Sequence, residues 1–135
     1  SSVWEYDPND EIWTQKTDMP TPRDQPTIAE IEGKLYLMGG WNFNASRSAL
    51  DTFDIYDPLL DKWEPTQKMP YNVADHVSGV IDRKIFLIGG MWALDVVGDD
   101  IYRLVYEYNP FPQPTTSISP KESLIGTWAS IKASK

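Results

Sequence analysis

The chain has 135 residues, which is enough for one domain with a sizeable hydrophobic core, and its formal net charge is −8. This negative charge argues against a nucleic-acid-binding surface and against binding to an anionic membrane, because both depend on clustered Lys and Arg. The absence of Cys excludes disulfide bonds and thiolate ligands, and no apolar run reaches the length of a membrane-spanning helix.

Short strands separated by turns are expected along most of the chain. Six Trp, seven Tyr and four Phe favour a packed β protein, and the apolar runs end at turn-forming pairs such as Asp–Pro and Gly–Gly. Residues 19–26 contain three prolines, which exclude a central strand, so a surface loop is expected there. The expected strands are residues 3–6, 12–15, 27–31, 35–39, 50–56, 62–66, 77–81, 85–89 and 101–108.

Residues of unlike chemical type recur at a constant separation of fifty positions. Glycine pairs end two apolar strands, at Gly39–Gly40 and at Gly89–Gly90, where a missing Cβ permits a bend or a close backbone approach. Further matches at this separation are Tyr6–Asp7–Pro8 with Tyr56–Asp57–Pro58, Trp13 with Trp63, Met19–Pro20 with Met69–Pro70, Ile31 with Ile81, and Lys34 with Lys84. A repeat of about fifty residues with four short strands per unit is typical of a β-propeller blade.

These repeated marks resemble the kelch repeat, which combines a double glycine after a hydrophobic strand, a Tyr–Asp–Pro-type turn, a following Trp and a Met–Pro. The resemblance implies an all-β fold: a kelch-type β-propeller segment of about two and a half four-stranded antiparallel blades. Residues 1–20 would form a half blade with strands c and d, residues 21–70 a full blade, and residues 71–135 a third blade. Trp13 and Trp63 are expected to pack between blades as core residues.

The third unit departs from the repeat. Tyr108–Asn109–Pro110 lies fifty-two residues after Tyr56–Asp57–Pro58, and residues 109–126 are a Pro/Ser/Thr-rich insert that is expected to be an extended connector. Residues 127–132 match a displaced outer strand, with Trp128 in the role of Trp63. A short helix is the alternative, because Leu124, Trp128 and Ile131 have helical spacing.

Two and a half blades do not close a ring, since propellers have about four to eight blades. Either a longer chain supplies the rest of the propeller, or several copies complete the ring as a homo-oligomer. The order of the expected strands favours the longer chain, because the segment ends after an outer strand and leaves no inner strands for a neighbour. The C-terminal tail also resembles the endings of some exported bacterial repeat proteins, which favours an exported protein.

The sequence contains no group of residues with the pattern of a catalytic or metal site. His76 has Asp75 and Ser78 close by, but a catalytic triad needs a separately positioned nucleophile, so we interpret His76 as a loop histidine. The group Asp95, Asp99 and Asp100 lacks the spacing of an EF-hand and is interpreted as a solvated turn. We therefore expect no enzymatic activity, no cofactor and no metal.

The residues best suited to binding lie in the d–a and b–c loops, which the kelch resemblance places on one face: residues 18–26, 41–49, 68–75 and 91–100. Exposed aromatic, Arg and Met side chains are enriched at protein interfaces. The candidate partner-binding residues are Arg23, Trp41, Asn42, Phe43, Asn44, Arg47, Tyr71, Asn72, Met91, Trp92 and Asp95. Alternatively, Trp41 and Trp92 cover the core of a neighbouring blade, and Arg23 matches a family Arg that is either structural or binds acidic ligands.

These features predict a non-catalytic scaffold that docks a protein partner through this face. The alternative is a carbohydrate-binding or carbohydrate-modifying, mutarotase-like propeller, in which the loop aromatics stack on sugar rings.

Overall fold

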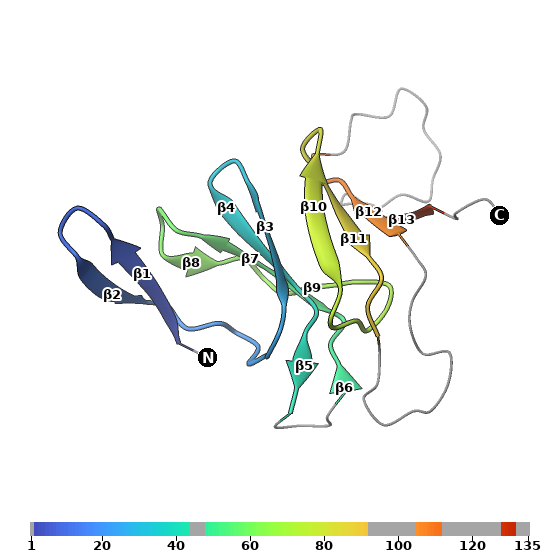
Figure 1. The fold of residues 1–135 in the computed structure, drawn as a ribbon, viewed down its shortest axis with the longest axis horizontal. Helices are drawn as coiled ribbons and strands as arrows, with labels where there is room; N and C mark the ends of the chain where they lie inside the picture. Colours follow the sequence, from blue (N-terminus) through green and yellow to red (C-terminus); the bar gives the residue numbers. More distant parts are fainter. Residues whose placement is uncertain (1, 44–47, 92–104, 112–127, 132–135) are drawn as a thin grey trace.

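The computed structural model describes residues 2–43, 48–91, 105–111 and 128–131, and the regular structure within these ranges consists of β-strands (Figure 1). The first sheet contains β1 (Val3–Asp7) and β2 (Ile12–Lys16). The second contains β3 (Thr27–Ile31), β4 (Lys34–Met38), β7 (Thr52–Asp57), β8 (Lys62–Trp63) and β9 (Gln67–Lys68). The third contains β10 (Val77–Ile81), β11 (Lys84–Ile88), β12 (Val105–Tyr108) and β13 (Trp128–Ile131), and a small ribbon pairs β5 (Trp41–Asn42) with β6 (Ser48–Ala49).

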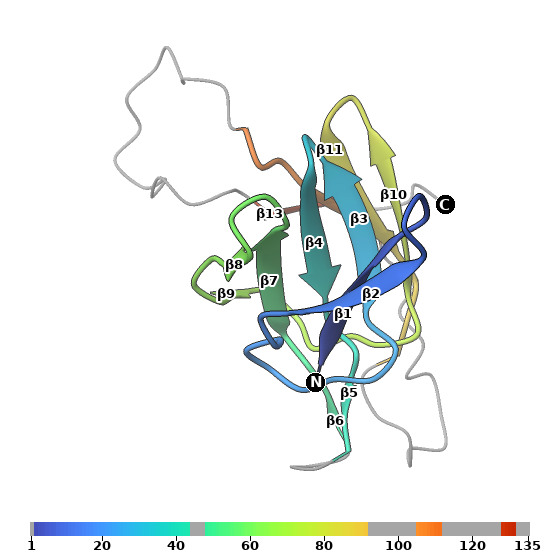
Figure 2. The ribbon, with the colours of Figure 1, turned by 90° about the vertical axis from the view of Figure 1, so that its left-hand side faces the viewer.

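The three sheets stand side by side in chain order and fan out from a common side (Figures 1 and 2). Pairing within each sheet is antiparallel, and the spatial orders β3-β4-β7-β8 and β10-β11-β12-β13 follow the sequence. The inner strands β3 and β10 are in contact, and the Ser78 hydroxyl donates to the Ile28 carbonyl 3.3 Å away. The predicted all-β fold of successive antiparallel sheets is confirmed.

The fifty-residue repeat extends to the backbone conformation. Positive φ angles occur at equivalent places in successive units: Glu11 with Asp61, Gln25 with Asp75, Glu32 with Asp82, Gly33 with Arg83, Gly39 with Gly89, and Gly40 with Gly90. Left-handed φ at both central residues marks a hairpin turn whose twist matches the strands it joins. Such a turn joins β3 to β4 at Glu32–Gly33.

The outer strand of the second sheet differs from the single strand predicted at residues 62–66. It is divided into β8 and β9, which both pair with β7. Pro65 lies between them and has no N–H with which to continue the ladder, while the Glu64 amide still donates to the Ile55 carbonyl at 2.8 Å.

At the C-terminus, residues 128–131 form a strand, not a helix. β13 pairs with β12, and Trp128 lies opposite Tyr108 in the same register that places Trp63 opposite Tyr56. Of the strand expected at 101–108, residues 101–104 lie outside the described ranges.

The main hydrophobic core lies between the second and third sheets. It consists of Ala29, Ile31, Tyr36, Met38, Phe53, Ile55, Met69, Val73, Ile85, Leu87 and Tyr108. Side chains alternate along a strand, so β4 directs Tyr36 and Met38 into this core while Leu37 is buried on the opposite face. The second face is only partly covered, because Ile28, which lies opposite Leu37, is 55% exposed.

The first sheet repeats one aromatic pair of the second but is far more exposed. Its rings Tyr6 and Trp13 are 4.9 Å apart, which matches the 4.8 Å between Tyr56 and Trp63. Trp63 joins two sheets, because its Nε1 donates to the Thr17 carbonyl at 3.0 Å. Trp13 is 62% exposed, so the interface packing expected for it does not occur within the described part of the chain.

The paired glycines fasten the second sheet to the segment that enters the third. A Cβ on Gly39 would overlap the carbonyl oxygen of Val73, and the amide of Gly40 donates to that same oxygen at 3.0 Å. A Cβ on Gly40 would lie 2.6 Å from the Asp24 carbonyl. Only glycine permits both approaches together with the positive φ of each residue.

This close approach predicts very different costs for two Gly→Ala substitutions. Gly33→Ala meets no atom within 4 Å and carries only the cost of a left-handed φ, about 1–2 kcal/mol of unfolding free energy. Gly39→Ala adds the overlap with Val73, so we expect a loss of at least about 3 kcal/mol. Urea unfolding of both variants measures the difference, and equal losses would show that the contact with Val73 does not matter.

Candidate functional site

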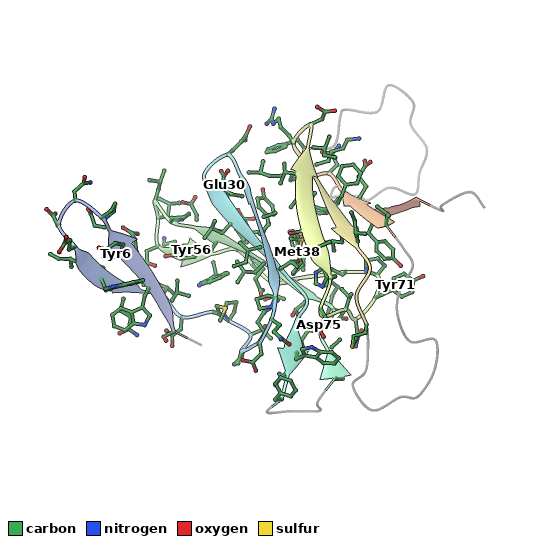
Figure 3. All side chains as sticks on the ribbon, viewed as in Figure 1. Tyr6, Glu30, Met38, Tyr56, Tyr71 and Asp75 are labelled. Atoms are coloured by element: carbon green, nitrogen blue, oxygen red, sulfur yellow. The ribbon has the colours of Figure 1, made fainter. Side chains whose placement is uncertain are left out.

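One face of the molecule is formed by the loops at the end of the sheets from which β5 and β6 project (Figure 1). We call it the loop face. Asp24 and Trp41 exchange two backbone hydrogen bonds of 2.9 and 2.7 Å, and Ala74 and Met91 exchange two of 2.9 Å. Each d–a loop is thus fixed to the b–c loop of its own unit. In Figure 3, Asp75 lies toward this face and Glu30 toward the opposite end.

Trp41 is fully buried and supports the residues around it. It packs with Ala49, Ala74 and Met91, and its Nε1 donates to Asp75 Oδ2 at 3.1 Å. Phe43 stacks on this indole at a centroid distance of 6.2 Å and is 46% exposed. The structure therefore gives Trp41 the core position that was the sequence alternative, and presents Phe43 to solvent.

The other described candidates differ in their exposure. Tyr71 is 49% exposed, and its ring is 5.5 Å from that of Tyr106. Asn72 is exposed, whereas Asn42 and Met91 are half-buried. Asn44, Arg47, Trp92 and Asp95 lie outside the described residues, as do Asp99 and Asp100.

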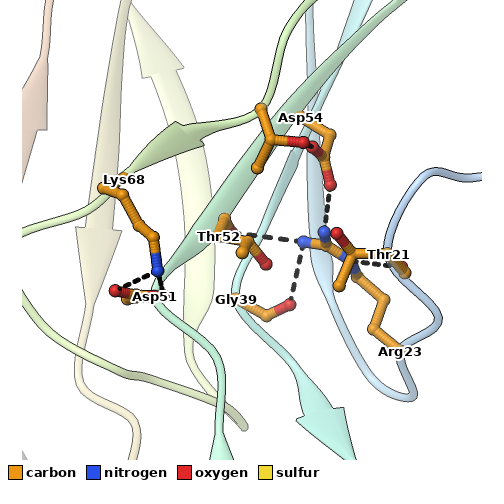
Figure 4. Close-up of polar contacts among 8 residues, drawn as sticks. Thr21, Arg23, Gly39, Asp51, Thr52, Asp54 and Lys68 are labelled. Atoms are coloured by element: carbon orange, nitrogen blue, oxygen red, sulfur yellow. Dashed lines mark hydrogen bonds and ion pairs between the residues drawn. The ribbon is translucent and has the colours of Figure 1, made fainter.

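Arg23 is buried and forms an internal ion pair with Asp54 (Figure 4). Its Nη1 donates at 3.2 Å to the carbonyls of Gly39 and Thr52, and Thr66 donates to the other Asp54 oxygen at 2.6 Å. Burial lowers the pKa of Arg23 from its ordinary value, and the Asp54 charge opposes that shift. This geometry matches the structural role that the family resemblance allowed for Arg23.

A cavity of about 330 Å³ opens on the loop face beside Phe43. Its lining consists of Ser2, Pro22, Arg23, Asp24, Trp41, Asn42 and Phe43. Four of the predicted residues, Arg23, Trp41, Asn42 and Phe43, are thus brought together. Tyr71 and Asn72 do not line this cavity.

His76 is buried where the second and third sheets meet and is not part of a triad. Its Nε2 lies 2.7 Å from the Thr27 hydroxyl, and its Nδ1 has no hydrogen-bond partner among the described residues. Added Cβ atoms on Gly39 and Gly90 would each approach this side chain to 2.9 Å. Burial lowers the pKa of His76 to about 4, opposed by Asp75.

No His, Cys, Asp or Glu cluster capable of holding a metal occurs among the described residues. A search of the same residues for a helix long and apolar enough to cross a membrane also finds none.

The family model of the Kelch motif matches residues 22–70, which contain the second sheet and the glycine pair at Gly39–Gly40. The chain belongs to the kelch-repeat family. It is 33% identical to human Kelch-like protein 15 over 94 residues, which is 67% of this chain and 15% of the relative. It is 24% identical to human Kelch-like protein 33 over 120 residues, which is 89% of this chain and 21% of the relative. The chain thus spans about a fifth or less of these relatives.

The fold also matches a solved structure. The structure of YjhT superposes with a TM-score of 0.65 and 22% identity, and the match covers 81% of this chain and 41% of that one. Together with the antiparallel sheets, this similarity confirms the predicted kelch-type propeller segment.

In this kelch segment, loss of Arg23 should be costly while loss of an exposed cation should not. Arg23→Met leaves Asp54 charged and buried, so we expect a loss of about 3–5 kcal/mol of unfolding free energy. The control is Lys68→Met, because Lys68 is 68% exposed in its pair with Asp51 and should contribute less than about 1 kcal/mol. Denaturant unfolding compares the two, and a loss of under 1 kcal/mol for Arg23→Met would contradict the assigned role.

Stability should fall in mild acid because of His76. Its pKa is about 4 in the folded protein, against 6.5 for a histidine in water, so the unfolded state binds the proton first as the pH falls. Keeping this imidazole neutral costs nothing above pH 6.5, where the unfolded state is neutral too. As the pH falls toward 4, the free energy of unfolding decreases by roughly 3 kcal/mol. His76→Gln, which keeps a polar group near Thr27, should show a flatter decline when unfolding is measured across this range. Identical pH profiles would contradict the buried neutral state.

Proposed function

We propose that this chain is a non-catalytic binding segment of a larger kelch propeller, and that a protein partner docks on its loop face. The similarity to Kelch-like proteins supports a kelch binding module at the level of the family. The choice of face rests on the exposed aromatic residues that the loops present.

Phe43 is the observation that carries this proposal. An aromatic ring gives a large contact area, and a ring that is already held in place loses little entropy when a partner binds. Phe43 is held from beneath by the buried indole of Trp41, which Asp75 in turn fixes from the next unit. Tyr71, in the loop before β10, adds a second exposed ring.

We further propose that other blades complete the ring, supplied by a longer chain or by further copies. The outer sheets carry exposed apolar side chains where a neighbouring blade would pack. Those of the first sheet are Trp4, Tyr6, Ile12 and Trp13, and those of the third are Val77, Val80, Ile81 and Ile88. By analogy with Trp63, the Trp13 indole would donate to a carbonyl of the preceding blade. The blade boundaries at residues 20 and 70 belong to this proposal.

Carbohydrate binding on the loop face is the second candidate. The cavity beside Phe43 also contains the polar side chains of Asp24 and Asn42. A sugar ring could stack on Phe43 and form hydrogen bonds with these two residues. Trp41 is unsuitable as a probe of this candidate, because its truncation would remove a buried side chain.

Peptides selected from a random displayed library against the wild-type chain provide a test of protein docking. Phe43→Ala should raise the Kd of the selected peptides at least about tenfold, since exposed aromatic anchors commonly carry over 1 kcal/mol of binding free energy. Leu59→Ala is the matched control. Leu59 is 94% exposed and lies in the turn after β7, at the end of that strand away from the loop face. Isothermal titration calorimetry measures each Kd.

Two outcomes would contradict docking on the loop face. One is a set of selected peptides whose affinity falls with Leu59→Ala and not with Phe43→Ala. The other is the failure of any peptide to bind while a neutral sugar binds and is lost in Phe43→Ala, which would favour the second candidate.

A further inference from the structure

A second cavity, of about 470 Å³, opens between the second and third sheets at the end opposite the loop face. It is lined by Ile31, Glu32, Lys34, Tyr36, Ile55, Glu64, Gln67, Tyr108, Pro110 and Phe111. The hairpin turn at Glu32–Gly33 forms part of its rim. Its volume lies within the range of pockets that bind small molecules, about 300–1,000 Å³.

The floor of this seam cavity is apolar and aromatic. Ile31 and Ile55 are 4% and 5% exposed, and the rings of Tyr36 and Tyr108 lie 6.4 Å apart, tilted by 55°. These side chains belong to the main core, so the floor is rigid. Phe111 adds a third aromatic ring.

The charged groups around the cavity are already paired within the protein. Lys34 Nζ lies 2.6 Å from Glu64 Oε1 and 4.0 Å from Asp57 Oδ2. Glu32 pairs with Arg83, whose guanidinium also lies 4.2 Å from the centroid of the Phe111 ring. A charged ligand would have to displace one of these pairs, so the cavity disfavours ions of either sign.

The rim and floor nevertheless offer several hydrogen-bonding groups. Burial raises the pKa of Tyr36, with a further contribution from Glu64, and burial raises the pKa of Tyr108 to about 12. The Tyr36 phenol is therefore protonated at neutral pH and carries an O–H group. The carboxylate of Glu64 accepts hydrogen bonds, and the side-chain amide of Gln67 can both donate and accept them.

We propose that the seam cavity binds a small uncharged molecule with several hydroxyl groups, of the class of neutral mono- and disaccharides. The half-buried ring of Phe111 can pack against the C–H face of a sugar ring, and hydroxyl groups both donate and accept hydrogen bonds without needing a counter-charge. The cavity volume of about 470 Å³ is that of a small-molecule pocket. This site is separate from the loop face and does not depend on the proposed protein docking.

Saturation-transfer NMR on the intact chain provides the test, with glucose, galactose, mannose, lactose and maltose as probes. Glucuronate and glucosamine serve as charged comparators. The structure predicts that at least one neutral sugar binds, and that Gln67→Ala raises its Kd about fivefold through loss of a hydrogen bond. Tyr36→Phe, which keeps the ring and removes the hydroxyl, should have a similar effect.

Leu59→Ala, at a 94% exposed residue that does not line the cavity, is the matched control and should leave the sugar Kd unchanged. Thermal unfolding followed by circular dichroism confirms that each variant is folded; if Tyr36→Phe is not, Gln67→Ala alone decides. Binding of none of the neutral sugars would overturn the proposal. So would tighter binding of a charged comparator, or a sugar signal that Phe43→Ala abolishes and Gln67→Ala leaves intact.

Discussion

The contact between Gly39–Gly40 and the Val73 carbonyl is the constraint on which the packing of the second and third sheets depends. The Val73 carbonyl oxygen lies in space that a Cβ on Gly39 would occupy. The Gly40 amide donates a hydrogen bond to the same oxygen at 3.0 Å. His76 packs against Gly39 and against Gly90. Strand β4 ends at Met38 directly before this contact, and both Met38 and Val73 belong to the main core.

The two ends of the sheets differ in chemistry. On the loop face, Trp41 holds Phe43 at the surface, and protein docking is the function we propose there. At the opposite end, paired charges such as Lys34 and Glu64 surround an apolar floor, which suits a neutral ligand. Each end also takes side chains from the next unit, because Asp75 fixes Trp41 on the loop face and Tyr108 and Phe111 line the cavity.

The strands and the repeat could be predicted because they depend on local pattern: β3 and β10 occur at the predicted residues. Strands of two residues, such as β5, could not, since they form only where the folded chain brings two segments together. For the same reason, the sequence could not decide whether Arg23 and Trp41 are structural residues or binding residues. Their partners Asp54 and Asp75 are 31 and 34 residues away, and no sequence spacing indicates those pairings.

Amide hydrogen exchange at Gly40 tests the central contact most directly. If the glycine pair and Val73 form one rigid joint, the Gly40 amide will exchange as slowly as the amides of β4 and far more slowly than those of the exposed β1–β2 hairpin. Exchange at the rate of that hairpin would contradict the account, because it would show that the sheets associate without this hydrogen bond.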